Sequence, residues 1–236
     1  RRKGRGGAVN KGEVKFMVSI AIDGPAGAGK STLARAAAKE LGYIYVDTGA
    51  LYRALALKFL RTETPMSGET AAGLLEKTEV TLGFSDGEQH VFLDGEDVSH
   101  LIRTPQVSMA ASKVSALPQV RAHLLELQRA MGRTENILMD GRDIGTVVLP
   151  NASVKIFLTA SAEERARRRY NELCERGENV TFEQVYRELC ERDYGDSHRA
   201  AAPLRAAEDS VTVDTTGLDA EQSLRLLLQT IRERLG

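Results

Sequence analysis

Eight consecutive residues, Gly24 to Ser31, combine three glycines with a lysine and a hydroxyl. Their sequence, GPAGAGKS, matches the GxxxxGK[ST] phosphate loop, in which backbone N–H groups converge on an anion at the positive end of a helix dipole. In such a loop Lys30 reaches the β- and γ-phosphates of a nucleoside triphosphate, and Ser31 holds Mg²⁺. The alternative is a glycine-rich turn that binds nothing. Because the apolar segment Phe16 to Asp23 supplies the strand that must precede a phosphate loop, we favour a triphosphate site.

Two further polar clusters follow predicted strands. The sequence DTGALYR at Asp47 to Arg53 follows an apolar run, and DGRDIG at Asp140 to Gly145 follows another. Since α/β proteins bind ligands at the carboxyl edge of their parallel strands, both clusters are expected to place arginine, hydroxyl and carboxylate groups there. The planar guanidinium of arginine binds two phosphate oxygens at once. The two clusters therefore predict a second, anionic substrate beside the triphosphate.

The elements that must position these clusters alternate between strand and helix. Apolar periodicity predicts helices at 31–41, 49–61, 104–116, 118–132, 161–193 with a break at 177–179, and 220–235, and strands at 16–23, 43–47, 136–140, 154–159 and 210–214. Residues 62–68 break the helical pattern, and no element is assigned to 69–79. Alternation between residues 80 and 93 around a turn predicts a small antiparallel sheet. The predicted fold is α/β, with a mainly parallel five-stranded sheet covered on both faces, giving three layers.

The composition of the chain excludes several classes of protein. The chain has 236 residues and a formal charge of −1 at pH 7, which argues against a nucleic-acid or membrane partner. Cys174 and Cys190 are the only cysteines and lack CxxC spacing, so we expect reduced thiols in a cytoplasmic protein rather than zinc or a disulfide. No apolar run approaches the ~20 residues of a membrane helix, and the start of the sequence has no signal-peptide core. The basic residues 1–15 predict a disordered extension.

The phosphate loop and the two polar clusters belong to a set of seven motifs that are spread along the chain. They are IDGPAGAGKST at Ile22 to Thr32, DTGALYRA at Asp47 to Ala54, DGEDVS at Asp94 to Ser99, DGRDIGTVV at Asp140 to Val148, KIFLTAS at Lys155 to Ser161, EERARRR at Glu163 to Arg169, and RDYGDSHRAAAPL at Arg192 to Leu204. Together they resemble the bacterial cytidylate kinases, a family of P-loop nucleoside monophosphate kinases. The resemblance runs from Met17 to about Leu235. It implies an enzyme that transfers the ATP γ-phosphoryl group to CMP, and to dCMP as a second acceptor, with Mg²⁺ as cofactor; nothing demands an oligomer, so we expect a monomer.

The resemblance also implies a division of the chain. After the extension at 1–15, the core begins at 16–60 with the phosphate loop, and 61–115 form a monophosphate-binding region that contains the small sheet. The core continues at 116–160. Residues 161–199 form a helical lid over ATP, and 200–236 return to the core as its last strand and C-terminal helix.

Site residues follow from the resemblance position by position. The implied ATP site comprises Gly24, Pro25, Ala26, Gly27, Ala28, Gly29, Lys30, Ser31, Thr32, Arg165 and Arg169, with Ser31 on the metal. The implied CMP site comprises Thr48, Tyr52, Arg53, Arg121, Asp140, Arg142, Asp143, Arg192, Asp196 and Arg199. Lys30, Arg142, Arg192 and Arg199 form the implied catalytic set.

The roles within the CMP site are implied in the same way. Asp143 accepts from the cytosine amino group, Arg121 donates to its acceptor side, and Thr48 adds a hydroxyl. Arg53 and Arg142 are assigned to the acceptor phosphate, Arg192 and Asp196 to the sugar, and Arg199 to the transferred group, while Tyr52 packs at the acceptor site.

Two alternatives remain open at this point. One is a kinase for a different small acceptor, such as UMP, AMP or a phosphorylated sugar. The other is a nucleotide switch without catalysis, against which the absence of an Asn-Lys-x-Asp guanine motif and the paired Arg/Asp clusters argue. For Arg167 and Arg168 a solvated charged helix face is as good an interpretation as a lid contact.

Overall fold

The computed structural model describes residues 17–85 and 87–236, and the predicted basic extension lies outside this part of the chain. Five parallel strands form the main sheet, in the order β2 (Ile44–Asp47), β6 (Ile137–Gly141), β1 (Ser19–Asp23), β7 (Val154–Thr159) and β8 (Val211–Asp214). The predicted five-stranded parallel sheet is confirmed. Because all five strands run the same way, their carboxyl ends meet along one edge.

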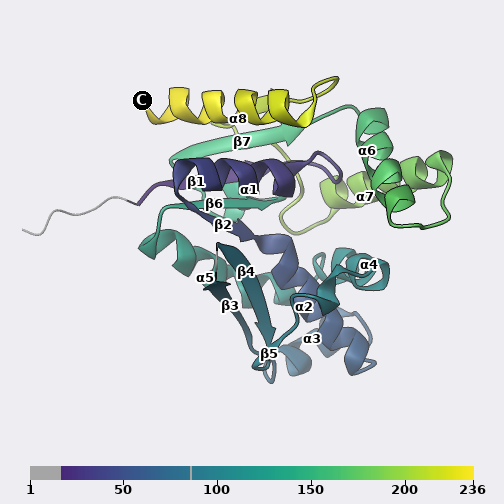
Figure 1. Cartoon of the computed structure of the whole chain (residues 1–236). Helices are drawn as coiled ribbons and strands as arrows, with labels where there is room; N and C mark the ends of the chain where they lie inside the picture. Colours follow the sequence, from purple (N-terminus) through teal and green to yellow (C-terminus); the bar gives the residue numbers. More distant parts are fainter. Residues whose placement is uncertain (1–16, 86) are drawn as a thin grey trace, which may run out of the picture.

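Alternation along β1 sends side chains to both faces of the sheet. Ile20 and Ile22 pack in the cluster shared with α1 (Lys30–Leu41) and α8 (Ala220–Leu235), whereas Ala21 packs in the opposite cluster, to which α5 (Pro118–Thr134) contributes. Helices therefore cover both faces, as a parallel sheet requires. In Figure 1 α8 lies along the top of the molecule.

A second lobe lies below this core in Figure 1. It contains α2 (Thr48–Arg61), α3 (Gly68–Leu75), α4 (Pro105–Val114), the short turn η1 (Leu101–Arg103) and an antiparallel sheet of β3 (Val80–Ser85), β4 (Glu88–Leu93) and β5 (Glu96–Asp97). The predicted small sheet is thus confirmed. The lobe has its own apolar core, in which Leu51, Leu55 and Phe59 of α2 are fully buried.

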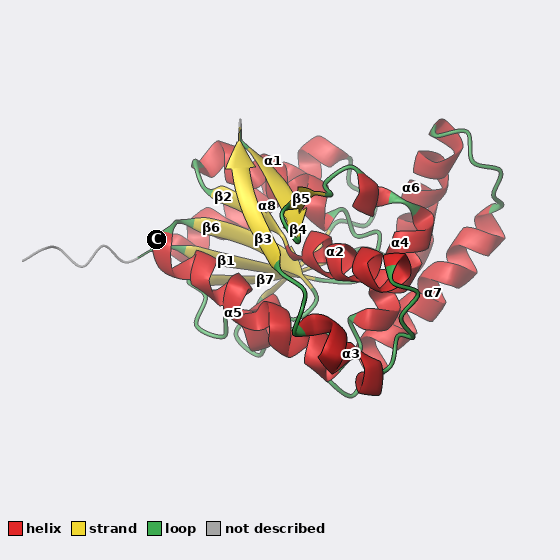
Figure 2. Ribbon diagram, turned by 90° about the horizontal axis from the view of Figure 1, so that it is seen from below, coloured by secondary structure: helices red, strands yellow, loops and turns green. Residues whose placement is uncertain are grey.

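One side chain fastens the small sheet to the main one. Gln89 of β4 accepts a hydrogen bond from the Asp47 N–H at 2.8 Å and donates to the Asp47 carbonyl at 3.1 Å. The amide thus occupies the free edge of β2 at its carboxyl end, and Figure 2 shows the small sheet crossing on the near side of the main sheet. This contact fixes the start of the Asp47 to Arg53 cluster.

A hairpin of two helices, α6 (Ala162–Glu175) and α7 (Phe182–His198), stands at the carboxyl edge and projects to the right in Figures 1 and 2. Ser161 and Thr181 cap the two helices by accepting backbone N–H groups. Gly177, with a φ of 77°, turns the chain between them, so the predicted break is confirmed. The helix α7 continues to His198 rather than ending at Asp193 as predicted, because Asp196 is held against the core.

Four of the described elements were not predicted: the short strand β5, the turn η1, the helix α3 and a turn after β6. The helix α3 begins where Ser67 accepts the Thr70 N–H, and it buries Ala71 and Leu75 in the second lobe. After β6 a π-helical turn, η2 (Ile144–Val148), follows the DGRD segment. Among the described helices, none is long and apolar enough to cross a membrane.

Candidate active site

A cavity of about 610 Å³ opens along the carboxyl edge of the main sheet. The phosphate loop and both polar clusters line it, together with parts of η1, α4, α5, α6 and α7. Its walls carry nine arginines and one lysine against five carboxylates. An enclosed surface with this excess of positive charge binds anions.

Backbone conformation shapes the phosphate loop. Gly24 has a φ of 153°, and a Cβ on it would lie 2.0 Å from the Leu158 carbonyl oxygen, so only glycine fits. Gly29, with a φ of 82°, leads into α1, which begins at Lys30. The Lys30 ammonium is buried and donates to the Pro25 carbonyl at 2.7 Å. The loop therefore folds back around its own lysine at the amino end of a helix, as an anion cradle requires.

The charge of Lys30 is poorly compensated. Burial, and then the positive charge of Arg142, lower the pKa of Lys30 well below its usual range. Phosphate oxygens placed beside both cations would reverse this effect. The loop and the DGRD segment thus meet at a point that favours a highly charged anion.

Asp140 faces the phosphate loop. Its carboxylate accepts from the Ser31 hydroxyl at 2.8 Å and from the Tyr45 hydroxyl at 3.1 Å. Burial, and then the negative charge of Asp47, raise the pKa of Asp140 to about 6. A hydroxyl and a buried carboxylate side by side are ligands that suit Mg²⁺, with nucleotide phosphate oxygens and water completing the shell. The predicted contact of Asp140 with CMP stays a prediction, since its carboxylate faces the phosphate loop and accepts from Ser31.

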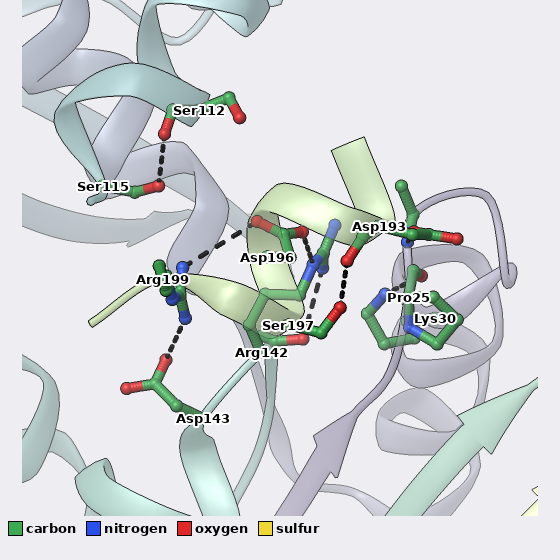
Figure 3. A network of polar contacts seen from close by, with 12 residues as sticks. Pro25, Lys30, Ser112, Ser115, Arg142, Asp143, Asp193, Asp196, Ser197 and Arg199 are labelled. Atoms are coloured by element: carbon green, nitrogen blue, oxygen red, sulfur yellow. Dashed lines mark hydrogen bonds and ion pairs between the residues drawn. The ribbon is translucent and has the colours of Figure 1, made fainter. Parts of the chain in front are cut away.

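Several of the predicted CMP-site residues meet at the far end of the cavity. Arg121 of α5 donates to Asp143, and its guanidinium carbon lies 5.5 Å from the centroid of the Tyr52 ring. Arg199, at the end of α7, lies 3.6 Å from the same carboxylate, as Figure 3 shows. Thr48 donates to the Asp140 carbonyl at 2.7 Å. Four separate segments thus bring a carboxylate, two guanidiniums and an aromatic ring to one spot.

Between the two ends lie the other arginines. Arg142 donates its Nε to Asp196 at 2.8 Å, and Arg53 lies 2.7 Å from Asp47. Arg192 lines the cavity with an exposed side chain, and desolvation by the surrounding protein, followed by the charge of Arg142, lowers its pKa. Among the described residues no carboxylate forms an ion pair with Arg192, so its guanidinium is free to bind a ligand phosphate.

The arginines of α6 separate into different environments. Arg169 lines the cavity beside Glu172, and its contact with ATP stays a prediction. Arg165 instead packs beneath the phosphate loop and donates to the carbonyls of Ala26 and Ala160, both at 2.9 Å; its contact with ATP stays a prediction. Arg167 pairs with Glu163 on the surface, which matches the solvated interpretation, whereas Arg168 donates to the Thr215 carbonyl after β8.

Asp23 is a functional candidate that sequence reasoning missed. Its buried carboxylate accepts the N–H groups of Ile144 and Gly145, each at 2.7 Å, and so fixes the turn that follows Arg142 and Asp143. Burial raises the pKa of Asp23 to about 6. Its place at the end of β1 was the available signal, because carboxyl ends of adjacent strands lie together.

Several lining residues carried no local sequence signal. They are Arg35, Arg103, Ser108, Ser112 and Arg176, which lie on helices or turns outside any motif. Only the fold brings them to the cavity.

A phosphate loop and an arginine-rich acceptor region on one cavity define a P-loop phosphotransferase. Comparison with known sequences gives the family directly: a family profile described as cytidylate kinase matches residues 20–233. The chain belongs to the cytidylate kinase family.

Individual relatives are similar over most of their length. A cytidylate kinase of Carboxydothermus hydrogenoformans is 54% identical over 213 residues, covering 90% of this chain and 96% of that protein. One of Caldicellulosiruptor bescii is 49% identical over 213 residues, covering 90% and 94%. Among solved structures, an uncharacterized protein from Eubacterium ventriosum shares 13% identity over 92% of this chain and 99% of its own, with a TM-score of 0.52, a similarity of fold alone.

Proposed function

We propose that the chain transfers the γ-phosphoryl group of ATP to CMP, giving ADP and CDP, with dCMP as a second acceptor. The observation that supports this most strongly is a single cavity with a phosphate loop at one end and the Arg121–Asp143 pair at the other. The names of the relatives agree with it.

Cytosine presents an amino donor beside a ring nitrogen and a carbonyl that accept. Asp143 accepts from the amino group and Arg121 donates to the acceptors, and in the present structure these two side chains satisfy each other. Tyr52 gives the base an aromatic wall. Uracil would set a carbonyl oxygen against the Asp143 carboxylate, at a cost of about 1–3 kcal/mol. This cost is the physical basis for choosing CMP over UMP.

The chemistry requires no general base. A phosphate oxygen of CMP is already anionic near neutral pH, so it attacks the γ-phosphorus directly. The bond between the γ-phosphorus and the β,γ-bridging oxygen breaks, and ADP leaves with that oxygen. Catalysis is then positioning and charge neutralisation. Lys30 neutralises the donor phosphates, and Arg53 and Arg142 hold the acceptor phosphate. Arg192 and Asp196 contact the acceptor sugar, and Arg199 stabilises the group in transfer.

Ser31 and Asp140 are the residues that would hold Mg²⁺ with ATP. When bound, the ion adds positive charge at the β- and γ-phosphates. After burial, the negative charge of Asp47 raises the pKa of Asp140, and a divalent cation held by Asp140 would oppose that effect.

An acceptor panel tests the proposal. ADP formation is measured in a coupled assay with ATP and, in turn, CMP, dCMP, UMP and AMP. We expect the highest kcat/KM with CMP and dCMP. A preference for AMP would reject the assignment of the base readers, and slow hydrolysis that CMP does not stimulate would favour a nucleotide switch.

Other expectations stay predictions. They are closure of the lid at 161–199 around both nucleotides, which would exclude water from the γ-phosphate, the monomeric state and the cytoplasmic location.

A further inference from the structure

The last turns of α7 contact both the phosphate loop and the DGRD segment. Asp193 and Asp196 lie three residues apart on α7 and so on one side of the helix, and Arg199 follows its last residue. Figure 3 shows Asp193 beside the phosphate loop, while Asp196 and Arg199 face the DGRD segment. One rigid element therefore touches the donor loop and the acceptor loop.

At the donor end, the contact is made with the loop backbone. Asp193 accepts the Ala26 N–H at 3.2 Å, and Arg165 donates its Nη1 both to the Ala26 carbonyl at 2.9 Å and to Asp193 at 2.5 Å. Both polar backbone groups of Ala26 are thus held by side chains of the helical hairpin. The packing is close, since a Cβ on Gly27 would lie 3.2 Å from Leu189 of α7.

At the acceptor end, the contacts are ionic. Asp196 accepts from the Arg142 Nε at 2.8 Å, and Arg199 lies 3.6 Å from Asp143. The Asp196 carbonyl also accepts the Leu204 N–H at 2.8 Å, which anchors the end of the helix to the following segment. A shift of α7 would therefore move the groups that hold the acceptor.

We propose that Asp193 is a positioning residue that couples the two substrate sites: by tying α7 to the Ala26 backbone, it makes ATP binding favour the arrangement of Arg142 and Arg199 that binds CMP. Phosphates in the loop fix its backbone, the loop fixes Asp193, and the helix carries that position to Asp196. Because coupling is reciprocal, CMP strengthens ATP binding by the same factor. The inference rests on the proposed function, since it takes ATP and CMP as the two ligands.

A merely structural role for Asp193 makes a different prediction. Removing a stabilising ion pair would weaken CMP binding equally with and without ATP. If Asp193 instead couples the two sites, its removal weakens only the effect that one ligand has on the affinity for the other. The ratio of two dissociation constants therefore separates the two roles.

The experiment is calorimetric titration of CMP into the folded chain, with and without a saturating ATP analogue whose β,γ-bridging atom is nitrogen, in the presence of Mg²⁺. For the wild type we expect the analogue to tighten CMP binding by about 5- to 150-fold, the usual range of coupling between sites. In Asp193→Ala the factor should fall to within about twofold of one, with CMP affinity in the absence of analogue nearly unchanged. Asp193→Asn, which keeps an acceptor for Ala26 but loses the charge facing Arg165, should be intermediate.

Glu188→Ala is the matched control, because Glu188 is an exposed acid of the same helix whose side chain accepts only from Gln184 among the described residues. It should retain the wild-type coupling. A wild type with no coupling, or an Asp193→Ala variant that keeps it, would overturn the inference; if that variant does not fold, full coupling in Asp193→Asn has the same meaning. A wild type that does not bind CMP at all would instead reject the proposed function.

Discussion

Replacing Asp143 with asparagine should reduce the selectivity for CMP over UMP while changing the shape of the side chain very little. The carboxylate is 5% exposed and faces two guanidiniums, those of Arg121 and Arg199, whose side chains are 11% and 6% exposed. The asparagine keeps one acceptor oxygen and adds an NH₂ group that can donate to the carbonyl of uracil. The charge that disfavours UMP is removed.

The size of the change in selectivity follows from the cost of placing the uracil carbonyl against the carboxylate. An unpaired or repelled polar group at this buried spot costs about 1–3 kcal/mol, so the ratio of kcat/KM for CMP over UMP should fall by about 5- to 150-fold. The same change leaves two arginines with less compensation, and loss of one partner of a buried ion pair can cost about 3–5 kcal/mol of stability. Retention of one acceptor oxygen makes the asparagine variant the milder choice over alanine.

The assay measures kcat/KM for both nucleotides at a temperature well below the melting temperature found by circular dichroism. Asp94→Asn is the control, because Asp94, in the turn between β4 and β5, pairs with Lys58 of α2 and does not line the cavity. It should leave the ratio unchanged. Equal losses on CMP and UMP in Asp143→Asn would refute the role of Asp143 as reader of the base.

Three further changes test other parts of the account. Lys30→Ala should lower kcat by about 10³-fold or more, the range for a charge-stabilising cation in phosphoryl transfer, with an unchanged circular-dichroism spectrum; retained activity would exclude the loop as the ATP site. Asp23 has a pKa of about 6 in the fold against 3.8 unfolded, so the native state binds the extra proton and stability falls as pH rises between these values. Between pH 4.5 and 7, the free energy of unfolding measured in urea should therefore fall by about 2 kcal/mol more in the wild type than in Asp23→Asn. The same pH dependence in both proteins would contradict a raised pKa of the buried Asp23. Gly24→Ala should lower the melting temperature, through a strained conformation worth about 1–3 kcal/mol and a clash with Leu158, whereas Gly73→Ala in α3 should not; a neutral Gly24→Ala would show that the loop can rearrange.

Long periodic segments and motifs were predictable from the sequence alone. Gly42 ends α1 in the left-handed conformation, and the apolar stripe of residues 220–235 forms α8, because local patterns dictate both. The helix α3 was missed because its sequence, GETAAGLL, is short and holds two glycines, so its stability comes from packing Ala71 and Leu75 rather than from propensity.

The site residues likewise fall into those that the sequence could predict and those that it could not. Lys30 and Arg142 could be proposed as site residues because the phosphate-loop pattern and the end of a predicted strand define their positions. The role of Asp23 depends on hydrogen bonds to residues more than a hundred positions away, and the burial of Arg165 beneath Ala26 depends on how α6 docks. Such long-range contacts exist only once the strands have taken their order in the sheet.

The destination of the γ-phosphorus tests the central claim most directly. The chain is incubated with CMP, Mg²⁺ and ATP labelled in its γ-phosphoryl group, and the labelled products are separated. Two facing anion sites predict that the label appears as the β-phosphoryl group of CDP. Label found in free phosphate at a rate that CMP does not change would contradict the account, because it would mean that water, and not a second bound nucleotide, receives the group.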